Sequence, residues 1–281
     1  MPTAIATEAA PAPRAKDYKS GIKPVWCPGC GHFGALSAVT KALAYLQLRR
    51  EEVAMISGIG CSSRLPAYID SYGFHGVHGR ALAVASGLKA ARPDLTVLVA
   101  GGDGDGFSIG GNHFLHACRR NMDMTYIVMD NEVYGMTKGQ ASPTTAPEWD
   151  RSKLTPYGTG VPSFRPTEIA LAAGASFIAR GFSGDPSGLT KLLVEAIEHR
   201  GFSFVHVLSP CPTFRPEQKE WKQKVHPCRM DTTSNAAEAA RLIQGDDGRA
   251  TGLLYVEDLP VWQPRNEGQA DMAKIEAEFR V

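Results

Sequence analysis

Short apolar runs alternate with longer amphipathic segments along most of the chain. Residues 53–57, 95–100, 126–129, 176–180 and 204–208 are apolar runs with the length of buried strands. Between them, apolar positions recur every three or four residues, as in 33–47, 81–91, 168–175 and 187–199, which predicts helices. Strands that alternate with helical crossovers are typical of an α/β fold with a doubly wound, mostly parallel sheet.

The chain divides into three parts by composition. Residues 1–17 are rich in Ala, Pro and Thr without a sustained period, which predicts a disordered arm or one that contacts a partner. Residues 18–214 carry the strand and helix pattern and form the predicted domain. Residues 215–281 begin with a charged stretch and then mix short helical and extended pieces, so we expect an irregular C-terminal extension.

Composition excludes several classes of partner. The net charge is +1, with 43% hydrophobic and 21% charged residues, so there is no bulk attraction to nucleic acid or to an anionic membrane. No apolar run approaches the roughly 20 residues that span a bilayer, and the N-terminus lacks the layout of a secretory signal. We expect a cytoplasmic protein whose six cysteines are reduced thiols, metal ligands or core residues rather than a disulfide framework.

A glycine-rich turn follows the run 95–100 and contains two aspartates, Asp103 and Asp105. Its glycines allow a sharp turn and close approach to a ligand, and the amide groups at the start of the next helix attract anionic oxygens. Asn131 follows the next apolar run, so parallel strands would bring it beside Asp103. Their oxygens suit Mg²⁺ together with a phosphorylated cofactor. Glycine-rich turns alone also fit dinucleotide sites and plain loops.

Four cysteines lie at turns or strand ends. Cys27 and Cys30 have C-x-x-C spacing, which by itself fits half of a zinc site, a redox dithiol or part of an iron–sulfur site. Cys61 and Cys211 each follow a predicted strand. Four thiolates suit a [4Fe-4S] cluster or structural zinc, with Cys228 the alternative for the fourth ligand.

The order of these motifs resembles a known family. Gly-Asp-Gly followed by Asn131, 28 positions after Asp103, is the signature of thiamine-diphosphate enzymes. Together with 58–63 (GIGCSS), 78–89 (HGRALAVASGLK) and 131–145 (NEVYGMTKGQASPTT), residues 18–230 resemble the β subunit of 2-oxoacid:ferredoxin oxidoreductases.

The resemblance implies a role for each matched residue. Asp103, Asn131 and the carbonyl of Val133 would bind Mg²⁺, and Cys27, Cys30, Cys61 and Cys211 would hold a [4Fe-4S] cluster. Lys138 and His78 are the candidate catalytic residues, although Lys138 also fits a solvated loop lysine. The residues expected to contact thiamine diphosphate are Ile59, Gly60, Cys61, Ser62, His78, Gly102, Gly104, Asp105, Gly135 and Met136.

The resemblance also implies the reaction and the partners. It predicts coenzyme A-dependent oxidative decarboxylation of a 2-oxoacid, with single electrons passing through the cluster to ferredoxin, a step that zinc cannot perform. The favoured substrate is 2-oxoglutarate; pyruvate or a broad range of 2-oxoacids is the alternative. An α subunit would supply the pyrimidine-binding domain and the activating glutamate, in an αβ heterodimer or a dimer of heterodimers.

Two functions from other classes stay open on the sequence alone. A non-oxidative thiamine-dependent decarboxylase subunit would need the Mg²⁺ residues but not the four cysteines. A zinc-stabilised interaction protein would bind neither thiamine nor iron.

Overall fold

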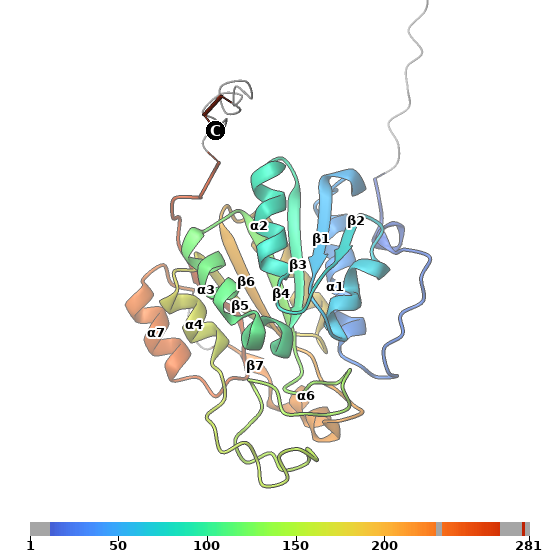
Figure 1. Ribbon diagram of the computed structural model, residues 1–281, viewed down its shortest axis with the longest axis vertical. Helices are drawn as coiled ribbons and strands as arrows, with labels where there is room; N and C mark the ends of the chain where they lie inside the picture. The colour runs from blue at the N-terminus through green and yellow to red at the C-terminus, as the bar shows by residue number, and fades with distance from the viewer. Residues whose placement is uncertain (1–11, 229–231, 265–276, 279–281) are drawn as a thin grey trace, which may run out of the picture.

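The central feature of the protein is a mostly parallel sheet flanked by helices, seen in a computed structural model (Figure 1). The structure describes residues 12–228, 232–264 and 277–278. Eight strands of this described part form the order β2-β1-β3-β4-β6-β5-β8-β7. β2, β1, β3, β4, β6 and β5 run parallel, and β8 is antiparallel to β5. The bounds are β1 Val53–Ser57, β2 Tyr72–His75, β3 Thr96–Gly102, β4 Met124–Asp130, β5 Phe177–Phe182, β6 Phe202–Leu208, β7 His226–Pro227 and β8 Ala250–Val256.

Helices cover both faces of the sheet, as the doubly wound fold requires. On one face, α1 (His32–Tyr45) packs against α5 (Pro186–Glu198). On the other face lie α2, α3, α4 and α7, whose apolar side chains form a second core. Their bounds are α2 Ala81–Ala91, α3 Gly111–Arg120, α4 Pro166–Ala172 and α7 Ala236–Gln244. The predicted fold class is therefore confirmed.

The central strands are mostly apolar because both faces of the sheet are covered. Every residue of β1, β4, β5 and β6 is buried, which explains the continuous apolar runs in the sequence. β1 has the predicted bounds, and β4 and β6 extend the predicted runs. β3 and β5 each begin one residue later than predicted and end two residues later. Within the described ranges, no helix combines the length and apolar character that a membrane span needs.

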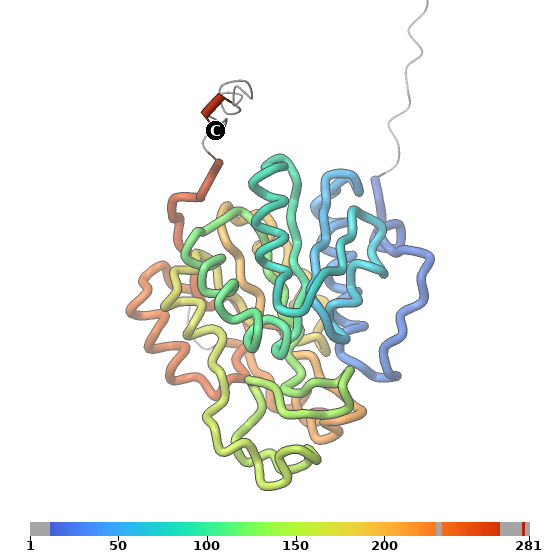
Figure 2. Tube along the Cα trace, in the orientation of Figure 1, coloured from blue at the N-terminus to red at the C-terminus, as the bar shows by residue number. Residues whose placement is uncertain are grey.

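The segments that flank the predicted domain are tied to it. In the C-terminal part, β8 extends the sheet beside β5. The 3-10 helix Pro216–Glu220, which leads into the short α6 (Trp221–Lys224), lies beside the long loop after β4 (Figure 2), and the ion pair Arg151–Glu217 joins the two. Near the N-terminus, a short 3-10 helix, Ala15–Tyr18, buries Tyr18 in the core. Of the predicted arm, residues 1–17, the first eleven positions lie outside the described residues. The three-part division stays a prediction.

Candidate functional site

The carboxyl ends of four neighbouring strands meet at one edge of the sheet. The register aligns Ser57 with Ala100, Gly102 with Met129, and Asp130 with Leu208. From β1 the chain crosses first to β2 on one side and then to β3 on the other. Parallel α/β sheets bind ligands beside such a switch in strand order.

A cavity of about 610 Å³ opens at this edge. It contains all the residues predicted to contact thiamine diphosphate or Mg²⁺, together with five that the motifs did not single out. The lining residues are His32, Ile59, Gly60, Cys61, Ser62, His78, Gly102, Asp103, Gly104, Asp105, Met129, Asn131, Val133, Tyr134, Gly135, Met136, Thr137 and Gln140. Tyr134, Thr137 and Gln140 belong to the quoted block 131–145, whereas nothing in the sequence marks His32 or Met129 as cavity residues.

Asp103 and Asn131 line the cavity from the ends of β3 and β4. The Asp103 side chain is buried, and its Oδ2 accepts a hydrogen bond from Thr144 Oγ1 at 3.1 Å. The same hydroxyl lies 2.8 Å from Oδ1 of buried Asp130. Burial and the charge of Asp130 raise the pKa of Asp103 well above its ordinary value. A divalent cation would relieve this repulsion, so the residues fit a metal site.

Asn131 and Val133 form a tight turn. The backbone N–H of Val133 donates to Asn131 Oδ1 at 3.2 Å, and both residues are buried. The carbonyl of Val133 and the amide oxygen of Asn131 thus belong to one short segment that faces the same cavity. The predicted Mg²⁺ ligand is the backbone carbonyl of Val133, which leaves its apolar side chain free to be buried.

Asp105 organises neighbouring segments of the cavity wall. Its Oδ1 accepts hydrogen bonds from the backbone N–H of Ile59 at 2.9 Å, from that of Gly79 at 2.8 Å, and lies 2.9 Å from His78 Nδ1. A Cβ atom at Gly58 would lie 2.1 Å from Asp105 Oδ2, so this close approach requires glycine. His78 is thereby held at the cavity with Nδ1 committed to Asp105, which makes Nε2 the nitrogen available to a ligand.

Gly104 lines the cavity, whereas Lys138 lies outside its lining. A Cβ atom at Gly104 would lie 2.2 Å from the ring of Tyr134, whose hydroxyl donates to the Gly104 carbonyl at 3.2 Å. Lys138 lies next to Thr137 but is exposed and is not one of the lining residues. Its backbone is left-handed, with φ of 78°. A catalytic role for Lys138 stays a prediction.

The four predicted cluster cysteines are electrostatic neighbours. Burial, together with the smaller effect of charges on Cys211, Cys61 and Cys27, raises the pKa of the Cys30 thiol to about 12. The backbone N–H of Cys30 donates to the Cys27 carbonyl at 3.0 Å, which closes the C-x-x-C turn. The N–H of Gly31 donates to the Pro210 carbonyl at 3.0 Å and so ties this turn to the Cys211 segment. Neighbouring thiols that repel one another as thiolates fit a cationic metal centre.

The cysteine region adjoins the Asn131 turn directly. Buried Gln218 accepts a hydrogen bond from the Cys211 N–H at 2.8 Å and donates one to the Asn131 carbonyl at 2.8 Å. On the other side, a Cβ atom at Gly135 would lie 3.6 Å from Cys61 Sγ. The motifs did not predict Gln218, which comes from the C-terminal extension and carries no local signal.

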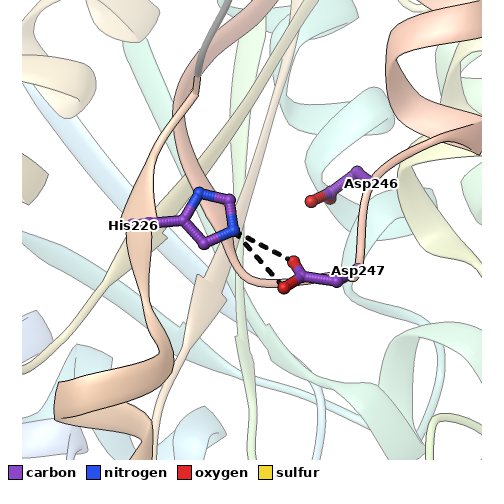
Figure 3. A group of neighbouring side chains, drawn as sticks. All are labelled: His226, Asp246 and Asp247. Carbon is purple, nitrogen blue, oxygen red and sulfur yellow. Dashed lines mark hydrogen bonds and ion pairs between the residues drawn. The ribbon is translucent and has the colours of Figure 1, made fainter.

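A second polar group lies on the C-terminal part, away from these motifs. Ligand atoms of His226, Asp246 and Asp247 all lie within 4.8 Å of one another (Figure 3). Asp246, however, forms an ion pair with buried Arg180, and His226 Nε2 lies 3.2 Å from Asp247 Oδ1. These carboxylates already have cationic or hydrogen-bonding partners.

Comparison with known proteins agrees with this geometry. Residues 58–207 match the family model of the C-terminal TPP binding domain of thiamine pyrophosphate enzymes. The chain is 48% identical over 201 residues to the 2-oxoglutarate oxidoreductase subunit KorB of Mycobacterium tuberculosis, which covers 72% of this chain and 54% of that protein. It is 47% identical over 189 residues to the 2-oxoglutarate synthase subunit KorB of Archaeoglobus fulgidus, covering 67% of this chain and 70% of that protein.

The chain belongs to the β subunits of 2-oxoacid:ferredoxin oxidoreductases. A solved structure of this family, the 2-oxoglutarate:ferredoxin oxidoreductase from Magnetococcus marinus with 2-oxoglutarate, coenzyme A and succinyl-CoA bound, superimposes with a TM-score of 0.89. It is 44% identical and covers 95% of this chain and 96% of the solved one. The alignments with the first two curated relatives, from M. tuberculosis and Aeropyrum pernix, span 54% and 64% of their lengths. The family membership confirms the resemblance, and it confirms that a thiamine-diphosphate domain forms the core of this β subunit.

Proposed function

We propose that the chain is the β subunit of a 2-oxoglutarate:ferredoxin oxidoreductase, which carries out coenzyme A-dependent oxidative decarboxylation. The observation that carries this proposal is the junction at the edge of the sheet. There, Gln218 joins the backbone of Cys211 to that of Asn131. A decarboxylation site and an electron acceptor would be adjacent in such an arrangement.

Thiamine diphosphate and Mg²⁺ would occupy the cavity at this edge. Asp103, Asn131 and the Val133 carbonyl would hold Mg²⁺, and the glycine-rich turn would approach the diphosphate closely. The bound cofactor supplies the electron sink for loss of CO₂ from the 2-oxoacid. The chain itself binds and orients, while Asp105 fixes the His78 ring so that Nε2 faces a ligand as donor or acceptor.

Cys27, Cys30, Cys61 and Cys211 would hold a [4Fe-4S] cluster. Zinc would satisfy the same thiolates but has no redox chemistry. The proximity of Cys61 to the cofactor cavity, which it helps to line, favours the redox-active centre. Ferredoxin is the proposed acceptor of the electrons, and the six free thiols suit the reducing cytoplasm in which we place the protein.

An α subunit is the proposed partner. Apolar side chains near the cavity are exposed, among them Val77, Ile109 and Met136, at 69%, 51% and 50%. Such exposure next to a ligand cavity is typical of a surface that a partner covers. In this proposal the α subunit closes the cavity and supplies the activating glutamate, in an αβ heterodimer or a dimer of heterodimers.

The names of relatives support 2-oxoglutarate as the substrate. The M. tuberculosis and A. fulgidus proteins are named for it, and the M. marinus structure contains it together with coenzyme A. Another relative, from A. pernix, is named only as a 2-oxoacid:ferredoxin oxidoreductase, at 46% identity over 70% of this chain. Pyruvate is therefore the comparison substrate for the test. In the proposal, the cation of Lys138 meets the distal carboxylate of 2-oxoglutarate.

The test is reduction of a viologen dye by the anaerobically purified protein with its co-purifying subunit. We expect dye reduction that depends on both 2-oxoglutarate and coenzyme A, and a much lower rate with pyruvate. Asp103→Asn should abolish the activity and Lys138→Ala should raise the KM for 2-oxoglutarate. Release of CO₂ from 2-oxoglutarate without dye reduction would instead identify a non-oxidative decarboxylase.

A further inference from the structure

The turn that carries two of the proposed Mg²⁺ ligands has an unusual backbone at its centre. Glu132, between Asn131 and Val133, has φ of 54°, in the left-handed region that residues with a Cβ atom rarely adopt. This conformation reverses the chain so that both neighbours face the cavity. A strained residue at a ligand-binding turn persists only when its surroundings fix it.

Every polar group of Glu132 has a partner. Its N–H donates to Asp130 Oδ1 at 2.9 Å, and its carbonyl accepts from Thr145 Oγ1 at 2.6 Å and from Arg215 Nη1 at 2.8 Å. Its carboxylate accepts from Arg215 Nη2 at 3.0 Å and from Arg249 Nη2 at 3.0 Å. Arg215 therefore donates hydrogen bonds to both the backbone carbonyl and the carboxylate of Glu132.

Both arginines come from the C-terminal extension and are themselves held in place. The guanidinium of Arg215 lies 4.7 Å from the ring centre of Trp149, and that of Arg249 lies 4.3 Å from that of Trp221. The side chains of Glu132 and Arg215 are only 13% and 6% exposed. Buried charges persist only with close partners, so this arrangement has one favoured geometry.

We propose that Glu132 is a positioning residue that fixes the Mg²⁺-binding turn through Arg215 and Arg249. Its carboxylate is committed to the arginines and does not itself bind the metal. The C-terminal extension thereby gains a function, since it holds the cofactor turn from outside the cavity. This inference rests on the proposed function, in which Asp103, Asn131 and Val133 bind Mg²⁺.

Two substitutions separate positioning from simple electrostatics. Glu132→Gln keeps the size of the side chain but removes its charge, and we expect the Kd for Mg²⁺ to rise roughly 10- to 100-fold, as for other groups that support metal ligands. Arg249→Gln removes a positive charge near the metal. Electrostatics alone would make that variant bind Mg²⁺ more tightly, whereas loss of positioning makes it bind more weakly.

Glu217→Gln is the matched control. Glu217 accepts from Arg215 Nε at 2.6 Å and pairs with Arg151, but it does not contact the turn. Glu217→Gln removes a negative charge next to Arg215. We expect the Mg²⁺ Kd of this variant to stay within about twofold of the wild-type value.

The measurement is a calorimetric titration with Mg²⁺ at saturating thiamine diphosphate. It uses the full-length protein with its co-purifying subunit, after removal of metal, and thermal unfolding verifies that each variant is folded. Weaker binding in Glu132→Gln and in Arg249→Gln supports the proposal. Tighter or unchanged binding in folded Arg249→Gln overturns it, even if Glu132→Gln fails to fold. Asp103→Asn distinguishes failure of this inference from failure of the proposed function. If that variant binds Mg²⁺ normally, the proposed function itself fails.

Discussion

Replacement of Gln218 by methionine would test how the cysteine region is joined to the Asn131 turn. Gln218 is 1% exposed, and its amide group makes hydrogen bonds to the backbone of Cys211 and of Asn131. Methionine has a similar unbranched shape but leaves one N–H and one carbonyl without a partner. Each unsatisfied buried group costs about 1–3 kcal/mol. The two together therefore lower the free energy of unfolding by about 2–6 kcal/mol, a large share of the roughly 5–15 kcal/mol typical of a domain.

Urea unfolding of the cofactor-free protein measures this loss directly. Iron and thiamine diphosphate contents of the anaerobically purified variant report whether both proposed centres weaken together, as we expect. Gln244→Met, at an exposed position at the end of α7, is the control and should change stability by less than about 0.5 kcal/mol. If Gln218→Met were as stable as this control and retained both cofactors in full, the two hydrogen bonds of Gln218 would have no energetic importance.

Three further predictions concern the cavity and the cysteines. Gly104→Ala places a Cβ atom 2.2 Å from the Tyr134 ring, so we expect thiamine diphosphate binding to weaken by about 1–3 kcal/mol, measured by calorimetry. Because burial and Asp130 raise the pKa of Asp103, Mg²⁺ must displace a proton below that pKa, and its Kd should rise by up to about tenfold for each unit of falling pH. Cys211→Ser should lose the visible absorption of the cluster and most of its iron.

Each of these predictions has a control or a contradicting result. Gly111→Ala, where a Cβ atom would have nothing within 4 Å, should bind thiamine diphosphate normally. A Mg²⁺ Kd that is independent of pH, with no proton released on binding, would contradict the role of Asp103. Cys118→Ser, at a buried position in α3, should keep its iron; equal losses in the two cysteine variants would remove Cys211 from the ligand set.

The sheet was predictable because its central strands are buried on both faces. The run 53–57 is apolar except for its last residue, Ser57, and became β1 with the same bounds. β2 was missed because its four residues, Tyr72–His75, are all exposed and include a glycine, so they form no apolar run. β8 was missed because partly exposed positions and Gly252 interrupt its apolar residues.

The candidate site was predictable where its residues lie within short motifs. Asp103 and Asn131 each follow a strand, so parallel pairing alone brings them to one edge. Gln218 and Glu132 could not be predicted, because their importance arises from contacts with residues more than 80 positions away. Asp105 was predicted only to contact the cofactor, and the structure shows that its carboxylate also forms hydrogen bonds with Ile59, His78 and Gly79.

The central claim is that a thiamine diphosphate site and a [4Fe-4S] cluster adjoin at one edge of the sheet. The most direct test is to add 2-oxoglutarate, with and without coenzyme A, to the anaerobically purified protein and its co-purifying subunit while the visible spectrum is followed. Our account predicts a brown protein with about four irons and one thiamine diphosphate per chain, as a [4Fe-4S] site requires, whose absorption bleaches on addition of substrate. A colourless protein that binds zinc, or an iron chromophore that 2-oxoglutarate never reduces, would contradict it.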